Sequence, residues 1–189
     1  MNSLTDKIIL IVGLGLIGGS IARGLKRSNP SLRIEAVDND ENQLSTAISE
    51  GSIDAFGELN SLCPKADLIV IALPPLATAS ILPQISELCS PQSVITDVAS
   101  VKTSVTAAVN KLDPEFIARF VPGHPIAGSE KSGYLASTDS LFNQRNIILT
   151  PQVNTEPEAV ALVHEMWRAL GADILGMSNY PWNFNLGLA

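Results

Sequence analysis

Short apolar runs alternate with segments of helical periodicity along nearly the whole chain. The runs are rich in isoleucine, valine and leucine, which predicts β-strands. These predicted strands cover residues 7–12, 33–37, 67–75, 93–100, 116–123, 146–151 and 172–177. Between the runs, apolar residues recur every three or four positions, as they do on one face of a helix. The helices predicted in this way lie at residues 16–25, 41–50, 102–112 and 155–170, with another between residues 75 and 93.

Strands that alternate with helices are joined by crossover connections, which favours a mostly parallel sheet. The nearly continuous apolar runs agree, because strands of a parallel sheet are covered on both faces. The pattern therefore predicts an α/β fold with a doubly wound, mostly parallel sheet in one domain over residues 1–177. Residues 178–189 have no charge and no periodicity, so we expect a tail or the stub of another domain there.

Composition and charge limit the kinds of molecule that the protein is expected to bind. With 189 residues, 46% of them hydrophobic, the chain can bury one substantial core. Its 19 acidic and 12 basic side chains give a formal net charge of -7, so the sequence offers no basic surface for nucleic acid or for an anionic membrane. A small molecule is the expected partner.

The two cysteines and the first apolar run bear on the cellular compartment. Cys63 and Cys89 lack the spacing of a zinc site or of a disulfide framework, so we expect no bound metal and a cytoplasmic location. The uncharged stretch 8–22 resembles the core of a signal peptide, but it is too short and too rich in glycine to span a bilayer. We therefore expect a strand, a turn and a helix there.

The turn after the first strand has the sequence Gly-x-Gly-x-x-Gly, which is typical of Rossmann-type dinucleotide-binding domains when a strand precedes it and a helix follows. Gly13 permits the tight turn, Gly15 lets the backbone approach a pyrophosphate, and Gly18 lets the helix pack closely on the strand. The amides at the helix start, around Leu16 and Ile17, would face the phosphates. The alternative is a glycine-rich turn without a ligand.

Asp38 ends the second predicted strand, about twenty residues after the last glycine of the motif. A carboxylate at this place can accept hydrogen bonds from both hydroxyls of an adenine ribose. With Asp40 nearby and no arginine beside them, a 2′-phosphate would meet negative charge, so NAD is expected, with NADP as the alternative cofactor. The other interpretation of Asp38 is a helix N-cap.

Two further segments reach the carboxyl edge of the sheet, where open parallel sheets bind their ligands. Leu73 and Pro74 follow the third predicted strand and would wall a nicotinamide, or they simply stop the strand. Asp97 and Ser100 follow the fourth strand, close to the expected cofactor. Ser100 is also a candidate cap for helix 102–112, which does not exclude a role beside the cofactor.

The third segment at this edge is "GHPIAGSEKSG", residues 123–133. Pro125 restricts the preceding His124 to extended conformations, so we expect the imidazole to project from a loop. An imidazole can accept a hydroxyl proton near neutral pH. A histidine in a loop is otherwise a solvated bystander, and His164, within helix 155–170, is expected to be a surface or packing residue.

Taken together, these motifs resemble the prephenate/arogenate dehydrogenases of tyrosine biosynthesis. The glycine loop occurs in many dehydrogenases, whereas Asp-x-x-Ser-Val-Lys followed by Gly-His-Pro-x-Ala-Gly is specific to this family. The resemblance extends over nearly the whole chain up to about residue 177. The matching segments are "IVGLGLIGGSIARGLK" (11–26), "TDVASVK" (96–102), "GHPIAGSEKSG" (123–133), "LF" (141–142) and "ILTP" (148–151).

The resemblance implies an NAD(P)-dependent oxidation of prephenate or arogenate that is coupled to decarboxylation. The ring hydroxyl loses its proton as a hydride leaves C4, the ring carboxylate leaves as carbon dioxide, and the ring becomes aromatic. By the same resemblance His124 accepts the hydroxyl proton, and Ser100 orients the histidine and the nicotinamide at the substrate. Glu130, in the matching loop, would lie near the substrate side chain. The residue types add an inference of their own, that Lys102 or Lys131 supplies positive potential for a dicarboxylate substrate.

By the same resemblance, members of this family continue into an all-helical domain that forms a dimer and adds substrate-binding residues, and we expect this chain to lack that domain. We therefore expect the cofactor domain alone, a homodimer that is doubtful for this chain, and exposed apolar surface where the helical domain would dock. Two functions stay open, a dehydrogenase and a nucleotide-binding module without turnover. Another Rossmann oxidoreductase is supported by the glycine loop alone. The choice between prephenate and arogenate is also open, although "SEKSG" is closer to the prephenate users.

Overall fold

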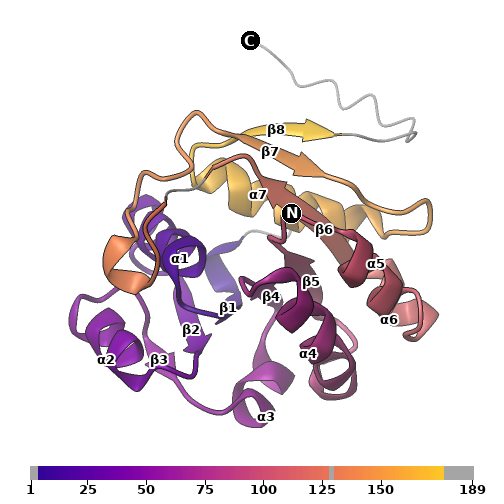
Figure 1. Ribbon diagram of the computed structural model, residues 1–189, viewed down its shortest axis with the longest axis horizontal. Helices are drawn as coiled ribbons and strands as arrows, with labels where there is room; N and C mark the ends of the chain where they lie inside the picture. Colours follow the sequence, from indigo (N-terminus) through magenta and orange to yellow (C-terminus); the bar gives the residue numbers. More distant parts are fainter. Residues whose placement is uncertain (1–3, 128–129, 177–189) are drawn as a thin grey trace.

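Strands and helices alternate along the chain as the sequence predicts (Figure 1). The structure is a computed structural model that describes residues 4–127 and 130–176. Its strands are β1 (Ile8–Val12), β2 (Arg33–Val37), β3 (Ala55–Phe56), β4 (Leu68–Ile71), β5 (Val94–Asp97), β6 (Phe120–Pro125), β7 (Asn146–Leu149) and β8 (Asp173–Gly176). Its α-helices are α1 (Leu16–Ser28), α2 (Glu41–Ser49), α3 (Leu59–Leu62), α4 (Pro75–Leu88), α5 (Thr103–Val109), α6 (Pro114–Ala118) and α7 (Pro157–Ala169). Short 3-10 helices are η1 (Leu4–Asp6), η2 (Cys63–Lys65) and η3 (Tyr134–Ala136).

The strands of the described residues form one eight-stranded sheet in the order β3-β2-β1-β4-β5-β6-β7-β8. Neighbouring strands are parallel except β6 and β7, which are antiparallel. The strand order changes direction between β1 and β4, as it does in doubly wound sheets. The predicted Rossmann-type, mostly parallel α/β fold is therefore confirmed, and ligands of such sheets bind outside the carboxyl ends of the strands at this switch point.

The hydrophobic core lies on both faces of the sheet. In β1, Ile9 and Ile11 pack with residues of α1 and α7, whereas Leu10 and Val12 pack with residues of α4 and α5. Successive residues of a strand point to opposite faces, so a strand covered on both faces must be apolar at every position. This is the physical reason why the central strands read as continuous apolar runs.

The strands predicted at 67–75 and 93–100 end earlier than expected, at Ile71 and Asp97. Pro75 is instead the first residue of α4. Proline is favoured at the start of a helix, because the N–H group that it lacks would be unpaired there. The residues between each strand end and the next helix are thereby left to line the switch point.

The predicted strand 116–123 is wrong in its first half, which belongs to α6. Asp113 caps this helix by accepting a hydrogen bond of 2.8 Å from the amide of Glu115. Strand β6 then continues to Pro125, where a loop was expected. His124 therefore lies in a strand rather than in a loop, because the backbone of β7 pairs with this segment.

Some features lie beyond the reach of the sequence pattern or of the structure. Strand β3 was not predicted, since two residues leave no periodic signal. The tail 178–189 lies outside the described residues, so the domain boundary near residue 177 stays a prediction. Within 4–127 and 130–176, no helix is long and apolar enough to cross a membrane.

Candidate active site

A cleft of about 420 Å³ opens at the carboxyl ends of the strands. Its walls come from the glycine loop, the turns after β4 and β5, the end of β6 and the segment before η3. Segments that are far apart in the sequence therefore meet around one hollow, at the place expected for a ligand. The predicted site residues that line this cleft are Gly15, Leu16, Ile17, Leu73, Pro74, Ser100 and Lys131.

The three glycines of the motif have different surroundings. Gly13 has a φ of +95°, and a Cβ atom there would lie 2.7 Å from the carbonyl oxygen of Ala72. A Cβ atom on Gly18 would overlap the carbonyl oxygen of Gly13. A Cβ atom on Gly15 would have no neighbour within 4 Å, and Gly15 lines the cleft. Two of the glycines thus serve the fold, and Gly15 leaves open space in front of the loop.

Asp38 holds the glycine loop instead of capping a helix. Its Oδ2 accepts a hydrogen bond of 2.6 Å from the amide of Leu14, and its Oδ1 accepts one of 2.9 Å from the amide of Asp40. The N-cap of α2 is Asp40, which accepts hydrogen bonds from the amides of Asn42 and Gln43. The capping interpretation of Asp38 is therefore wrong, and its half-buried carboxylate lies beside the loop that would hold a dinucleotide.

The turn after β5 carries Ser100 on the cleft wall. Ser100 is exposed and does not cap the following helix, because the N-cap of α5 is Lys102, which makes no side-chain cap bond. The turn after β4 supplies the facing part of the wall through Leu73 and Pro74. The serine is thus accessible from the cleft, and its role beside a cofactor stays a prediction.

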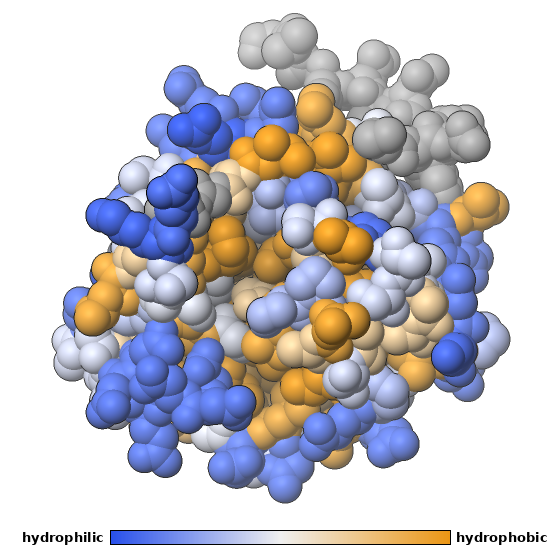
Figure 2. Space-filling view, in the orientation of Figure 1, coloured by the Kyte–Doolittle hydropathy of each residue, from blue (hydrophilic) through white to orange (hydrophobic). Residues whose placement is uncertain are grey.

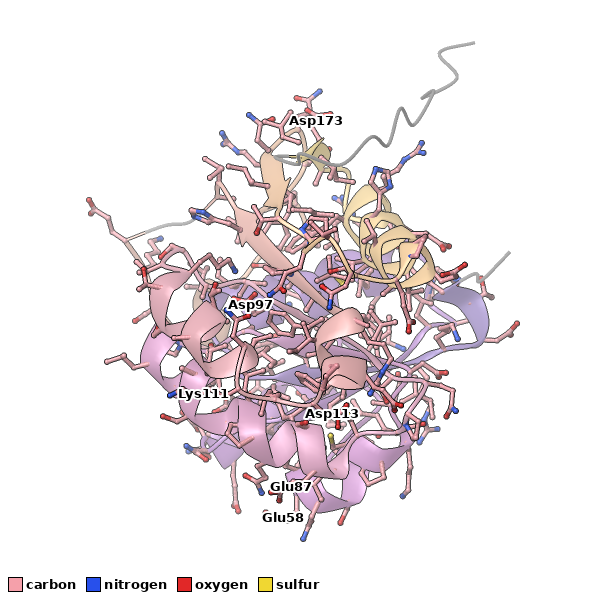
Figure 3. All side chains as sticks on the ribbon, turned by 90° about the vertical axis from the view of Figure 1, so that its right-hand side faces the viewer. Glu58, Glu87, Asp97, Lys111, Asp113 and Asp173 are labelled. Carbon is pink, nitrogen blue, oxygen red and sulfur yellow. The ribbon has the colours of Figure 1, made fainter. Side chains whose placement is uncertain are left out.

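Asp97 lies beneath this turn and is completely buried, with 0% of its surface exposed. Its Oδ2 accepts hydrogen bonds from the Lys102 ammonium at 2.6 Å and from the Ala99 amide at 3.0 Å. Lys102 Nζ also donates to the carbonyl oxygen of Gly123. The pair therefore ties the end of β5 to β6, and Figure 3 shows Asp97 well inside the outline of the molecule.

Burial shifts the titration of both members of this ion pair. It raises the pKa of Asp97 and lowers the pKa of Lys102, because each charge is held away from water, while the attraction between the two opposes both shifts. Neither residue lines the cleft. Of the two lysines considered for a substrate carboxylate, Lys131 borders the cleft, whereas the half-buried Lys102 is paired with Asp97.

His124 lies near the end of β6, opposite Ile148 of β7. The next residue, Pro125, lines the cleft. His124 is half-buried and does not itself line the cleft, which agrees with the alternation of side chains between the two faces of a strand. His164 lies on α7, where burial, together with the nearby Arg168, lowers its pKa.

The stretch after β6 was only partly anticipated as a wall of the cleft. Glu130 is exposed and does not line the cleft, whereas Lys131 does. Ala127, Ser132 and Gly133 also line it, although nothing in their residue types marks them for this role. Their place within the family motif is the signal that could have indicated them.

Comparison with known sequences identifies the family of this chain. The family described as "Prephenate dehydrogenase, nucleotide-binding domain" matches residues 21–175. The chain belongs to this family. The match covers most of the α/β sheet described above, including the Ser100 turn and the 123–133 stretch on which the resemblance depends.

Individual members of the prephenate dehydrogenase family extend this finding. The prephenate dehydrogenase of Lactococcus lactis subsp. cremoris is 36% identical over 167 residues, which make up 88% of this chain and 47% of the relative. The chain thus spans about half the length of the curated relatives that it matches.

Solved structures of the prephenate dehydrogenase family have the same fold. The prephenate dehydrogenase from A. aeolicus, in complex with hydroxyphenyl propionate and NAD+, has a TM-score of 0.83 and 33% identity, over 94% of this chain and 62% of that one. The arogenate dehydrogenase of Synechocystis has a TM-score of 0.82 and 30% identity, over 90% of this chain and 59% of that one.

Proposed function

We propose that this chain forms the nucleotide-binding part of an NAD-dependent prephenate or arogenate dehydrogenase of tyrosine biosynthesis. The observation that carries the proposal is the cleft at the switch point, where the glycine loop, the Ser100 turn and the Pro125 end of β6 meet. The last two of these segments contain the motifs that distinguish the family, and the glycine loop is common to many dehydrogenases. A small-molecule substrate is consistent with a hollow of about 420 Å³, which is in the range of ligand pockets.

The glycine loop suits a dinucleotide. Gly15 leaves space for a pyrophosphate, and Leu16 and Ile17 at the start of α1 border the same space, where the helix dipole favours negative charge. Leu73 and Pro74 offer an apolar wall for a nicotinamide. Bound NAD would supply the chemistry of the reaction by accepting a hydride.

Asp38 decides the choice of nucleotide in this proposal, because its carboxylate can accept hydrogen bonds from both ribose hydroxyls and repels a 2′-phosphate. We expect Asp38→Ser to weaken NAD binding at least about tenfold, or about 1.4 kcal/mol. NADP binding should be weakened less than NAD binding, because the variant also removes the repulsion of the 2′-phosphate. Calorimetric titration of both nucleotides against wild type and variant measures this. Equal affinity of the wild-type chain for NAD and NADP would contradict the preference.

In the proposed reaction His124 accepts the proton of the substrate ring hydroxyl. The antiparallel pairing of β6 with β7 holds the backbone of His124 in a fixed conformation, which favours a defined position for a proton acceptor. Ser100, on the cleft wall, orients the reacting groups. Lys131 borders the cleft and offers positive charge to a substrate carboxylate, and Glu130 lies one residue away. Asp97 acts from beneath, by holding Lys102 against β6.

The experiment that tests the function mixes the purified chain with NAD and either prephenate or arogenate and follows the absorbance of the reduced nucleotide. Turnover with one of the two substrates supports the dehydrogenase and identifies the substrate. Nucleotide binding by calorimetry without turnover supports the alternative, a nucleotide-binding module. Absence of nucleotide binding would refute both.

The assembly and the compartment are further parts of the proposal. The family's homodimer is a proposal for this chain, to be tested by sedimentation. We expect a cytoplasmic enzyme, because Cys63 and Cys89 are both free thiols, which suits a reducing compartment.

A further inference from the structure

A continuous series of hydrogen bonds runs from the glycine loop to the wall of the cleft. It begins with the amide of Leu14 and the amide of Asp40, both of which donate to the Asp38 carboxylate. Gln43 Nε2 then donates to Asp40 Oδ2 at 2.9 Å, and Gln43 Oε1 accepts a hydrogen bond of 2.5 Å from the amide of Tyr134. The side chain of one residue of α2 thus connects the acidic pair after β2 with η3.

The orientation of the Gln43 amide is fixed by its two partners. A carboxylate can only accept a hydrogen bond and a backbone N–H can only donate one. The amide nitrogen must therefore face Asp40 and the amide oxygen must face Tyr134. No charged side chain of similar size can make both contacts, because a carboxylate lacks the donor and an ammonium lacks the acceptor.

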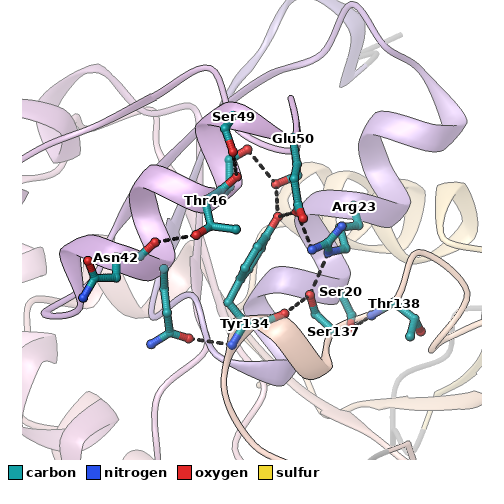
Figure 4. A network of polar contacts seen from close by, with 12 residues as sticks. Ser20, Arg23, Asn42, Thr46, Ser49, Glu50, Tyr134, Ser137 and Thr138 are labelled. Atoms are coloured by element: carbon teal, nitrogen blue, oxygen red, sulfur yellow. Dashed lines mark hydrogen bonds and ion pairs between the residues drawn. The ribbon is translucent and has the colours of Figure 1, made fainter.

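Tyr134 is itself firmly anchored between α1 and the end of α2 (Figure 4). Its side chain is completely buried, and its hydroxyl oxygen lies 2.6 Å from Ser52 Oγ and 2.8 Å from Glu50 Oε2. The guanidinium of Arg23 lies over the ring, 4.4 Å from its centroid, and also pairs with Glu50. A Cβ atom on Gly19 would lie 2.8 Å from the ring, so the ring packs directly against the backbone of α1.

The residues directly before this anchor form one wall of the cleft. Lys131, Ser132 and Gly133 line it, and Gly133 has a φ of +81° at the point where the chain turns into η3. The position of Tyr134 therefore determines where this wall stands. Gln43 binds the amide of Tyr134, which is the first backbone group after the wall.

We propose that Gln43 is a positioning residue that couples the ribose end of the nucleotide site to the Lys131–Gly133 wall of the cleft. This inference rests on the proposed function only in that the chain must bind an adenine nucleotide. Ribose hydroxyls that bind Asp38 share its two oxygens with the amides of Leu14 and Asp40, and a second donor on each oxygen changes the strength and direction of these amide hydrogen bonds. A shift of Asp40 moves the Gln43 amide, which is hydrogen-bonded to Asp40 at one end and to the Tyr134 amide at the other. Nucleotide binding therefore changes the position of the Lys131–Gly133 wall.

Hydrogen exchange of the Tyr134 amide, measured by NMR on the full chain, tests this coupling. ADP is the probe, because it carries the adenosine ribose but has no nicotinamide that could reach the wall directly. We expect saturating ADP to slow the exchange of this amide at least about threefold in the wild-type chain. The same measurement is made on Gln43→Glu, which keeps the acceptor for Tyr134 but loses the donor to Asp40, and on Gln43→Ala, which loses both.

Gln43→Glu is expected to keep slow exchange without ADP but to lose the response to ADP, and Gln43→Ala is expected to exchange faster in both conditions. Asn42→Ala is the matched control, because the hydrogen bonds recorded for Asn42 involve its backbone, and it should respond as the wild type does. Thermal unfolding of each variant shows that the fold is retained.

The outcomes separate this inference from the proposed function. A wild-type response to ADP in Gln43→Glu, or no response in a wild-type chain that binds ADP, overturns the coupling and leaves the dehydrogenase proposal intact. A wild-type chain that binds neither ADP nor NAD overturns both. Loss of the response in the two Gln43 variants, with Asn42→Ala unchanged, supports the coupling.

Discussion

Three glycines within six residues of one loop are constrained by different parts of the molecule. Gly13 and Gly18 are limited by neighbouring backbone, whereas Gly15 faces the empty space of the cleft. The sequence motif treats the three alike, and the surroundings of each Cβ position tell them apart. Substituting alanine at each position therefore distinguishes an effect on the stability of the fold from an effect on ligand binding.

We expect Gly15→Ala to keep the fold, because its φ of -74° does not require glycine and a Cβ atom there meets no neighbour within 4 Å. The methyl group should weaken NAD binding at least about tenfold, or about 1.4 kcal/mol, by occupying the space of the pyrophosphate. Gly18→Ala is expected to lose about 3 kcal/mol of unfolding free energy or more, since its methyl group meets the Gly13 carbonyl. Denaturant unfolding and calorimetry measure the two effects. Tight NAD binding by Gly15→Ala would show that the ligand lies elsewhere.

His124→Asn is the corresponding test of the proton acceptor. Asparagine fits a strand position and keeps a polar side chain, but it cannot take up a proton, so turnover is expected to fall by about 10²–10⁴-fold. The dissociation constant of NAD should change by less than about threefold, because the role assigned to His124 concerns the transition state. Steady-state kinetics and calorimetry on the same preparation give both values, and a variant that retains most of its turnover would remove His124 from the mechanism.

For single residues, the sequence predicted a place in the site where the structure allows few other residue types at that position. The places of the glycines in the turn and of Ser100 on the cleft wall could be predicted, because tight turns and the carboxyl edge of a parallel sheet favour those residue types. The contacts of these residues and of Asp38 with a cofactor stay predictions. Gln43 and Tyr134 could not, since their importance comes from meeting each other across about ninety residues of chain. A glutamine in an exposed helix gives no sign of such a partner.

Among the secondary-structure elements, the ends of β5 and β6 are joined by a buried ion pair and not by packing alone. Lys102, before α5, donates hydrogen bonds both to Asp97 at the end of β5 and to the carbonyl oxygen of Gly123, one residue before His124. A buried pair of this kind adds little net stability, but the loss of one partner leaves the other charge without compensation. The ends of these two strands therefore depend on both residues.

Lys102→Met is expected to lower the free energy of unfolding by about 3–5 kcal/mol at pH 8, because Asp97 remains charged and buried. Burial raises the pKa of Asp97, and loss of the ammonium raises it further, so folded Asp97 holds its proton to a higher pH than unfolded Asp97. The free energy of unfolding of the variant therefore decreases as the pH rises from the pKa of Asp97 in the unfolded chain to its pKa in the folded chain. Its deficit relative to wild type should be smaller at pH 5 than at pH 8.

Urea unfolding at the two pH values measures this deficit. Lys111→Met is the control, because Lys111 is exposed and its loss should change stability by less than about 0.5 kcal/mol at either pH. A deficit that is independent of pH would mean that Asp97 is not the group left unpaired.

The ends of strands and helices were predictable where a long apolar run meets glycine, proline or a polar cluster. The predicted ends were wrong where pairing with a strand distant in the sequence determines where a strand stops. The central strands were recognised because both of their faces are buried. The end of β6 was missed because its hydrogen bonds come from β7, which pairs in the antiparallel direction and leaves no local pattern around His124. The short α6 was missed although Asp113 and Pro114 form a cap signal at its start.

For the molecule as a whole, several large apolar side chains remain exposed on segments that adjoin the cleft. Leu76 follows Pro75 with 76% of its surface exposed, Val101 follows Ser100 with 56%, and Ile126 follows Pro125 with 48%. Apolar residues also gather over the middle of the face shown in Figure 2. Exposed apolar groups of this kind promote association, which agrees with the docking surface expected from the sequence.

The double variant Leu76→Lys, Ile126→Lys is therefore expected to sediment as a monomer at concentrations where the wild-type chain associates. Its melting temperature should be close to that of wild type, because neither side chain belongs to the core. Leu135→Lys is the control, since Leu135 is also exposed but lies on η3. Association that is equal in all three proteins would show that the surface next to the cleft does not mediate it.

The order of the last three strands has a practical consequence for anyone who attaches a label, a tag or a fusion partner to this protein. Strand β8 pairs along its whole length with β7, and β7 pairs with the part of β6 that contains His124. Mechanical load applied at the edge strand is therefore transmitted through two ladders of backbone hydrogen bonds to the candidate proton acceptor. An attachment at the start of the chain, before η1, avoids that path.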